Sequence, residues 1–322
     1  EYPTPGESLR RKRVWGSFST GGSRGIRESH EYVRKGGAAA RMMLVQAAAN
    51  AWGVSADQCT AANSVITHGV TGRTVSFGAI AEAASKLPVP TEIVLKDPKV
   101  WKVIGKRIRR LDTRDKVNGS RVYGIDLTFP GMLNATIREC PVFGGKLKSF
   151  DGAKALKMKG VKHVIAVGET AVAVVADTFW QAKTGIEAVT IEWDEGPNAK
   201  VSSESIAQNL QEGLSAQQAF VGNEAGNMAV AMTAAASKLE SQYFYPYQNH
   251  ATMEPMNATA RWTPDRCDVW VPTQDGESSL AATIAAAGIP AEKCDVHKIN
   301  LGGGFGRRGA FQDYTRQAVL IA

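Results

Sequence analysis

Residues 301–308 read Leu301-Gly302-Gly303-Gly304-Phe305-Gly306-Arg307-Arg308, and the rest of the chain is organised around this stretch. Glycine loses more backbone freedom on folding than any other residue, so such a run is favoured where the backbone needs a positive φ or approaches another body closely. The two arginines suit bidentate phosphate contacts. The sequence predicts a strand at 294–301 and a helix at 311–321. We therefore predict a loop that cradles an anionic cofactor, with a plain glycine-rich turn as the alternative.

The same loop contains a dinucleotide-like pattern. Gly304-x-Gly306-x-x-Gly309 has the G-x-G-x-x-G spacing and follows the expected strand. That fingerprint also needs a βαβ unit and an acidic residue about 20 residues further on. The chain ends at Ala322, and the residues before the loop show little βαβ alternation. An NAD-dependent dehydrogenase is kept as an alternative.

Length and composition indicate a globular protein of two or three domains. The chain has 322 residues, of which 43% are hydrophobic and 21% charged. A net charge of +7 suits anionic cofactors or partners. The basic runs at 10–13 and 106–110 are expected to be solvated surfaces, so nucleic acid binding is not expected. No apolar run approaches 18 residues, so we expect no transmembrane segment.

Neither the cysteines nor the isolated histidine indicates a metal site. Cys59, Cys140, Cys267 and Cys294 are scattered without C-x-x-C spacing, which argues against zinc and iron–sulfur sites. Buried free thiols are expected, with disulfides as the alternative in an oxidising compartment. His68 is expected in a turn or the core.

The first part of the chain is expected to be mainly helical. After an extended lead-in at 1–19, residues 20–25 read Thr-Gly-Gly-Ser-Arg-Gly, and a helix is expected at 28–52. Glycines before a helix N-terminus can bind an anion or merely cap the helix, and both interpretations stay open. A strand pair within 60–75, a helix at 77–86 and a linker at 91–110 follow.

Residues 112–197 are predicted to form a separate α+β unit with an architectural role. We expect strands at 123–127, 133–138, 163–167, 171–176 and 189–193, and helices at 151–158 and 180–188. No nucleophile, base and orienting group occur together in this stretch.

The last part begins with a polar surface excursion at 198–237. Strands are expected at 240–245, 258–262 and 268–271, and a helix at 278–287. Between the strands lies His250-x-x-Met253-Glu254-Pro255-Met256-Asn257. If buried, these polar groups must be hydrogen-bonded, either to one another or to a polar cofactor.

Three motifs together resemble one family. The stretch from His250 to Pro255, Thr273-Gln274 and the glycine run resemble the molybdenum-binding large subunit of the xanthine dehydrogenase/aldehyde oxidase family. They are most similar to its isoquinoline 1-oxidoreductase beta-subunit branch, which includes membrane-associated aldehyde dehydrogenases. The resemblance implies an α+β fold, with a hammerhead α/β domain at 112–197 inserted beside parts of a molybdopterin-binding α+β domain at 1–111 and 198–322.

The resemblance also implies roles for individual residues. Gln274 would hydrogen-bond an oxo ligand of molybdenum, and Phe305 with Gly306 would line the metal's other side; these two side chains, Gln274 and Phe305, are the catalytic candidates. The expected cofactor-binding residues are Gly22, Ser23, Thr273, Gln274, Gly302, Gly303, Gly304, Phe305, Gly306 and Arg307. No protein side chain is expected to ligate the metal.

Two departures and two absences qualify the resemblance. Arg307-Arg308-Gly309 stands where purine-oxidising relatives have Gly-Lys-Glu, so purines are not expected as substrates. Arg24-Gly25-Ile26 replaces further hydroxyl residues. The family's general-base glutamate would lie beyond Ala322, and its glutamine–glycine loop before residue 1. We therefore expect the chain alone to hold little or no molybdenum and to be inactive.

The implied activity is oxidative hydroxylation of an N-heterocycle or an aldehyde. The cofactor would be molybdopterin, in a cytosine dinucleotide form. Electrons would pass to an iron–sulfur small subunit or a cytochrome c subunit, in the periplasm or at the membrane. The alternatives are the NAD-dependent dehydrogenase and a cofactor-free assembly module. Analysis of the full-length protein separates the three, since molybdenum supports the hydroxylase, bound nicotinamide the dehydrogenase and neither the assembly module.

Overall fold

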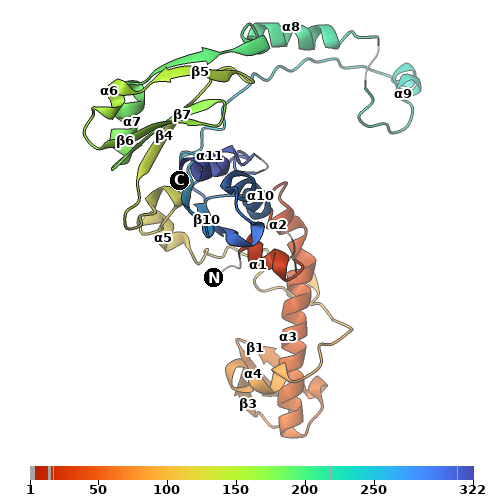
Figure 1. Ribbon diagram of the computed structural model, residues 1–322. Helices are drawn as coiled ribbons and strands as arrows, with labels where there is room; N and C mark the ends of the chain where they lie inside the picture. The colour runs from red at the N-terminus through yellow and green to blue at the C-terminus, as the bar shows by residue number, and fades with distance from the viewer. Residues whose placement is uncertain (1–3, 14–15, 17, 218–219, 310) are drawn as a thin grey trace. The chain divides into compact units, whose positions relative to one another are not determined.

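The computed structural model describes residues 4–13, 16, 18–217, 220–309 and 311–322. The chain folds as two compact units, Thr20–Arg121 and a second unit formed by Glu1–Ser19 with Val122–Ala322 (Figure 1). Helices and strands are mixed throughout, which confirms the α+β class. Among the described residues, no helix combines the length and apolar character needed to cross a membrane. The division into domains at 111 and 197 stays a prediction.

The unit Thr20–Arg121 is built on one long helix. α2 (Arg24–Arg27) precedes α3 (Ser29–Trp52), which ends at Gly53 with a φ of 68°. β1 (Cys59–Ala62), β2 (Val65–His68) and β3 (Thr74–Ser76) form an antiparallel sheet, and α4 (Phe77–Ser85) and the short α5 (Thr113–Val117) follow. The long helix was predicted correctly, but the expected strand pair is three strands. Buried His68 contacts Thr71 Oγ1 at 2.7 Å, as expected for a core histidine.

Residues 134–194 of the other unit form two small sheets. β4 (Asn134–Glu139), β7 (Ala171–Ala176) and β6 (Val161–Val167) are antiparallel in that order, and β5 (Lys146–Asp151) pairs with β8 (Thr190–Asp194). α6 (Ala153–Leu156) and α7 (Phe179–Glu187) complete this part. All six residues of β7 are buried, which explains its continuous apolar sequence. The core joins Val172 and Val174 to Ile186 and Val189.

Three strand predictions differ from the structure. Residues 124–126 form a 3-10 helix, because the Asp126 carboxylate accepts from the amide of Tyr123 and closes a turn. Residues 240–245 form no strand, although their aromatic-rich sequence favours one, because no described segment pairs with them. β5 was missed because a bulge between Leu147 and Ser149 breaks its alternation.

The C-terminal part contains a three-stranded sheet backed by two helices. α8 (Ser203–Gly213) and α9 (Met228–Ala234) precede β9 (Thr259–Thr263), β10 (Arg266–Val271), α10 (Gly276–Ala287), β11 (Cys294–Lys298) and α11 (Asp313–Ile321). β10 and β11 are parallel and joined through α10. This βαβ connection corrects the expectation of little βαβ alternation. One sheet face packs its valines against Leu280, Tyr314 and Val319 of the helices.

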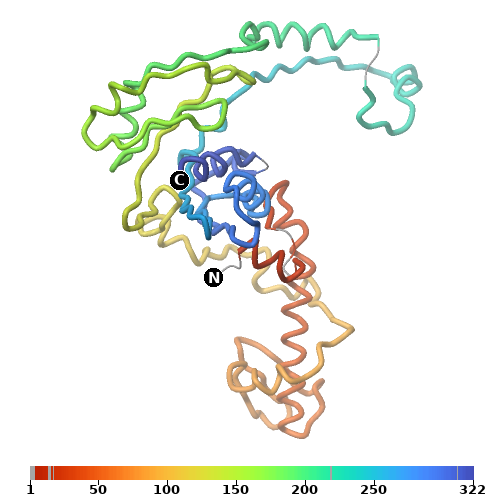
Figure 2. Tube along the Cα trace, viewed as in Figure 1, coloured from red at the N-terminus to blue at the C-terminus, as the bar shows by residue number. Residues whose placement is uncertain are grey.

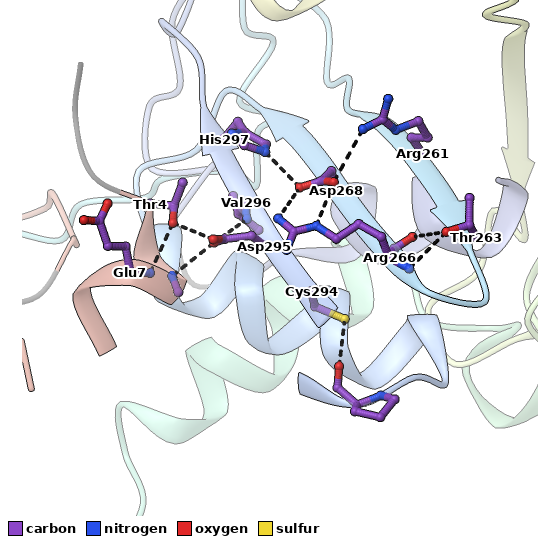
Figure 3. A network of polar contacts seen from close by, with 12 residues as sticks. Thr4, Glu7, Arg261, Thr263, Arg266, Asp268, Cys294, Asp295, Val296 and His297 are labelled. Carbon is purple, nitrogen blue, oxygen red and sulfur yellow. Dashed lines mark hydrogen bonds and ion pairs between the residues drawn. The ribbon is translucent and has the colours of Figure 1, made fainter. Parts of the chain in front are cut away.

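The opposite sheet face carries polar side chains (Figure 3). Asp268 accepts from Arg266 at 2.7 and 2.9 Å and contacts His297 Nε2 at 3.0 Å. The neighbouring Asp295 accepts from Thr4 at 2.5 Å and from the amide of Gly6 at 3.1 Å. These bonds fasten α1 (Pro5–Arg10), at the red end of the trace, to the blue strand β11 (Figure 2).

Candidate functional site

Residues 301–309, the glycine loop, follow β11 and lie against the segment 249–257. The amide of Glu254 donates to the carbonyl of Gly302 at 2.9 Å, and the amide of Gly302 donates to Glu254 Oε2 at 2.8 Å. A Cβ atom at Gly302 would overlap the side chain of Glu254. Glycine is therefore required at 302 by a contact within the protein itself.

The other glycines of the loop are favoured for different reasons. A Cβ atom at Gly304 would lie 2.9 Å from Gln274 Oε1, so the loop and Gln274 approach closely there. Gly303 and Gly306 have φ values of 104° and 91°, which favour glycine. The amide of Gln274 donates to the carbonyl of Arg308 at 2.9 Å. The structure thus brings together Gln274 and the glycine loop, as the motifs predict.

The tip of the loop is strained and exposed. Phe305 has a φ of 51° and a side chain that is 76% exposed. Ala251, in the neighbouring segment, has a φ of 43°. A residue other than glycine in the left-handed backbone region raises the free energy of the folded state by about 1–3 kcal/mol, and such residues cluster at ligand sites. An exposed aromatic ring held on strained backbone is therefore a feature to be explained by a ligand.

The backbone amides from Gly303 to Gly306 point to an anionic ligand. Within the part of the chain that the structure describes, these four successive amides donate to no acceptor. Gly303, Phe305 and Gly306 are exposed and Gly304 is half-buried. Successive amides on a backbone with left-handed residues form concavities that bind phosphates and other anions. The residues present therefore fit the anionic cofactor that the sequence predicts.

Both arginines of the loop are engaged by protein groups, whereas the sequence favoured phosphate contacts for them. Arg308 is fully buried and donates to the carbonyls of Gly303, Pro272 and Glu254 at 2.9, 3.2 and 2.7 Å. Burial lowers the pKa of the Arg308 guanidinium, and the Glu254 carboxylate acts in the opposite direction. Arg307, which is partly exposed, makes a bidentate ion pair with Asp313 at 2.8 and 2.5 Å. The Asp313 carboxylate raises the pKa of Arg307.

Thr273 belongs to a buried hydroxyl network behind the loop. Ser279 Oγ donates to Gln312 Oε1 at 2.7 Å and lies 2.9 Å from Thr273 Oγ1. Thr315 Oγ1 donates to the same Gln312 oxygen at 3.1 Å. Thr273, Ser279 and Thr315 are at most 1% exposed. The network holds the end of β10 and the helices α10 and α11 together beneath Gln274.

A cavity of about 210 Å³ lies beside the loop. It is lined by Asn249, His250, Ala251, Thr252, Pro255, Met256 and Arg307. Ligand pockets of drug-sized molecules are typically about 300–1,000 Å³, so this cavity can take only part of a large cofactor. His250 is exposed, whereas Glu254 is buried in the hydrogen-bonded network with Asn257 and Arg308.

Most of the predicted site residues thus gather around the glycine loop, but two of them belong to the other unit. Gly22 and Ser23 lie in the unit Thr20–Arg121, both exposed, with φ values of 54° and 57°. Their share in the site stays a prediction. Sequence reasoning missed the Glu254–Arg308 pair, although the polar motif around Glu254 was a signal for it. Within the described ranges, no group of three or more His, Cys, Asp or Glu side chains could hold a metal.

Comparison with known proteins identifies the C-terminal region. Residues 211–322, which include the glycine loop and Gln274, match the family described as molybdopterin cofactor-binding domain. Isoquinoline 1-oxidoreductase subunit beta of Brevundimonas diminuta is 30% identical over 92% of this chain and 43% of its own length. These likenesses support a molybdenum-binding subunit of the xanthine dehydrogenase/aldehyde oxidase family.

Two further proteins extend the comparison. A protein of Gluconacetobacter polyoxogenes named membrane-bound aldehyde dehydrogenase [pyrroloquinoline-quinone] is 28% identical over 96% of the chain and 41% of its own length. The chain therefore spans less than half the length of these two relatives. The aldehyde oxidoreductase of Desulfovibrio gigas has the same fold, with a TM-score of 0.51 and 20% identity over 76% of this chain and 32% of that one. The family resemblance and the fold class expected from the sequence are confirmed.

Proposed function

We propose that the chain is part of a molybdenum hydroxylase large subunit, an oxidoreductase that hydroxylates an N-heterocycle or an aldehyde. Both substrate classes occur in the names of its relatives. The observation that carries the proposal is the row of four amides from Gly303 to Gly306, which donate to no acceptor in the described part of a domain matched as molybdopterin-binding. In a plain turn, only solvent would accept from these amides.

The loop residues would bind and orient the cofactor. The amides of Gly303 to Gly306 would donate to its anionic oxygens, and Arg307, at the edge of the cavity, would add positive charge. Gln274, whose carboxamide lies against Gly304, would donate to an oxygen ligand of the metal. The exposed ring of Phe305 would shield the reacting centre from water. When bound, the molybdenum cofactor would supply a two-electron oxidation and an oxygen atom.

The finer features are proposed on the family resemblance. The cofactor would be the cytosine dinucleotide form of molybdopterin, and Gly22 and Ser23 stay proposed cofactor-binding residues. Residues 112–197 would be a hammerhead domain. Electrons would leave through an iron–sulfur small subunit or a cytochrome c subunit, at the periplasmic side or at the membrane. The name of the Gluconacetobacter relative, membrane-bound, agrees with that location for that protein.

The substrate would be an aldehyde or an N-heterocycle rather than a purine. Arg307-Arg308-Gly309 takes the place of a loop that carries a carboxylate in purine-oxidising relatives. Arg308 is buried, and its guanidinium is engaged by protein carbonyls. The loop therefore offers a substrate no carboxylate at these three positions.

Equilibrium dialysis tests the proposal. As purified, the 322-residue chain is expected to hold little or no molybdenum, so it would be dialysed against an excess of molybdopterin cytosine dinucleotide released from a purified molybdenum hydroxylase. Bound molybdenum would be measured by mass spectrometry. We expect saturable binding that weakens at least about tenfold in Gly303→Ala, whose added Cβ is strained at a φ of 104°. Gly213→Ala, at the end of α8 with open space around it, is the control. Binding of pyrroloquinoline quinone or NAD in place of the molybdenum cofactor would contradict the proposal.

A further inference from the structure

Arg308 is the largest side chain that is completely buried in the described part of the chain. Its Nε donates to the carbonyl of Gly303 at 2.9 Å, and its Nη1 donates to the carbonyl of Pro272 at 3.2 Å. Its Nη2 donates to the carbonyl of Glu254 at 2.7 Å and contacts Glu254 Oε2 at 3.2 Å. A buried charge is tolerated only when it is paired and hydrogen-bonded, and Arg308 meets that condition inside the protein.

The side chain of Arg308 closes the glycine loop on itself. It reaches back to Gly303, so the turn that carries Phe305 is fastened at both ends by one residue. The carbonyl of Arg308 accepts from the amide of Gln274 at 2.9 Å, which ties the loop to the predicted metal-facing side chain. One arginine thereby positions the free amides and Gln274 relative to each other.

Glu254 holds the other side of the same arrangement. Its Oε2 accepts from the amide of Gly302 at 2.8 Å and from Arg308. Its Oε1 accepts from the amide of Ile125 at 3.2 Å and from Asn257 Nδ2 at 3.0 Å. Because the carboxylate is 5% exposed and fully engaged, it cannot also serve a ligand without breaking these bonds.

We infer that Arg308 and Glu254 are positioning residues that hold the glycine loop in its cofactor-accepting conformation before any cofactor binds. The inference rests on the proposed function for its meaning, but the preformed loop is measurable without cofactor. A preformed loop avoids the ordering cost that glycine would otherwise impose on binding. The two arginines of the loop therefore have different roles, since Arg307 lines the cavity while Arg308 holds the loop behind it.

Hydrogen exchange of the cofactor-free chain tests the inference. We expect the amides of Gly302, Glu254 and Gln274 to be protected in the wild-type chain, since each donates to the Glu254 carboxylate or to a carbonyl of the glycine loop. In Arg308→Lys and in Glu254→Gln, we expect their exchange to accelerate at least about tenfold, while the amides of β7 keep their protection. Arg13→Gln, which removes an exposed ion pair with Glu277 in the same unit, is the charge control and should leave the loop unchanged.

Several results would overturn the inference. Unprotected Gly302 and Glu254 amides in the wild-type chain would show that the loop is not preformed, and this result requires no variant to fold. Unchanged loop exchange in both variants would show that the pair does not hold the loop. In the loaded protein, the variants should also release molybdenum at least about tenfold faster with β7 still protected, a split that a residue needed only for stability would not produce. If the loop is protected but the molybdenum cofactor, added in excess, does not bind, the proposed function fails and the preformed loop stands.

Discussion

Gly302→Ala should destabilise the unit that contains the glycine loop by about 2–6 kcal/mol. The added Cβ would lie well inside 3.0 Å of Glu254 atoms, so either the loop or Glu254 must move. Overpacking of this kind costs roughly 1–3 kcal/mol. The movement would also weaken the two hydrogen bonds between residues 254 and 302, at 2.9 and 2.8 Å, each with a net value of about 0.5–1.5 kcal/mol.

The assay must separate this unit from Thr20–Arg121, because a chain with two units need not unfold in a single transition. We would follow urea denaturation by hydrogen exchange in peptides from β10 and α10, which form the core beneath the loop. Gly213→Ala, with nothing within 4 Å of the new Cβ, should be neutral or stabilise by up to about 1 kcal/mol. A Gly302→Ala variant as stable as the wild type would refute the argument that Glu254 requires glycine at 302.

Three further outcomes follow from the same unit. The Arg266 guanidinium lowers the pKa of Asp268 to about 2. Because the unfolded carboxyl has a pKa near 3.9, the ionised Asp268 stabilises the folded state above that pH, and this contribution is lost as the pH falls through the folded pKa. The free energy of unfolding, measured against pH, should therefore drop by about 1–2 kcal/mol between pH 5 and pH 2 in the wild type but not in Asp268→Asn. Burial raises the pKa of the Cys267 thiol to about 11, so iodoacetamide at pH 8 should label Cys267 only after unfolding, and labelling at the denatured rate in the native chain would contradict this burial. Gln312→Leu should destabilise by roughly 2–3 kcal/mol because buried hydroxyls lose their acceptor, and a urea midpoint equal to that of the wild type would refute the network.

Elements with local causes were predictable from the sequence. β7 was found with the correct bounds because both of its faces are buried and its sequence is continuously apolar. α3 was found because its alanine-rich run ends at a glycine that takes a left-handed φ. The aromatic stretch 240–245 was misassigned because strand formation needs a partner, and local composition carries no information about one.

The site was predictable in its location but not in its internal logic. The glycine pattern located the loop, and its spacing from Gln274 suggested that the two meet. The same pattern assigned every glycine to ligand approach, whereas Gly302 is required by Glu254, 48 residues earlier in the chain. The sequence likewise favoured phosphate contacts for both arginines, although Arg308 is buried. Contacts between distant residues of this kind depend on the tertiary arrangement, which local patterns do not contain.

Amide chemical shifts of the glycine loop test the central claim most directly. The 322-residue chain, labelled with ¹⁵N, would be titrated with molybdopterin cytosine dinucleotide and, in separate samples, with NAD and pyrroloquinoline quinone. We predict that the molybdenum cofactor shifts the amides of Gly303, Gly304, Phe305 and Gly306 while those of β7 stay unchanged, because the four loop amides donate to no acceptor in the described part of the chain. Unchanged loop amides at saturating cofactor, or the same shifts produced by NAD, would contradict the assignment of this loop as a molybdopterin site.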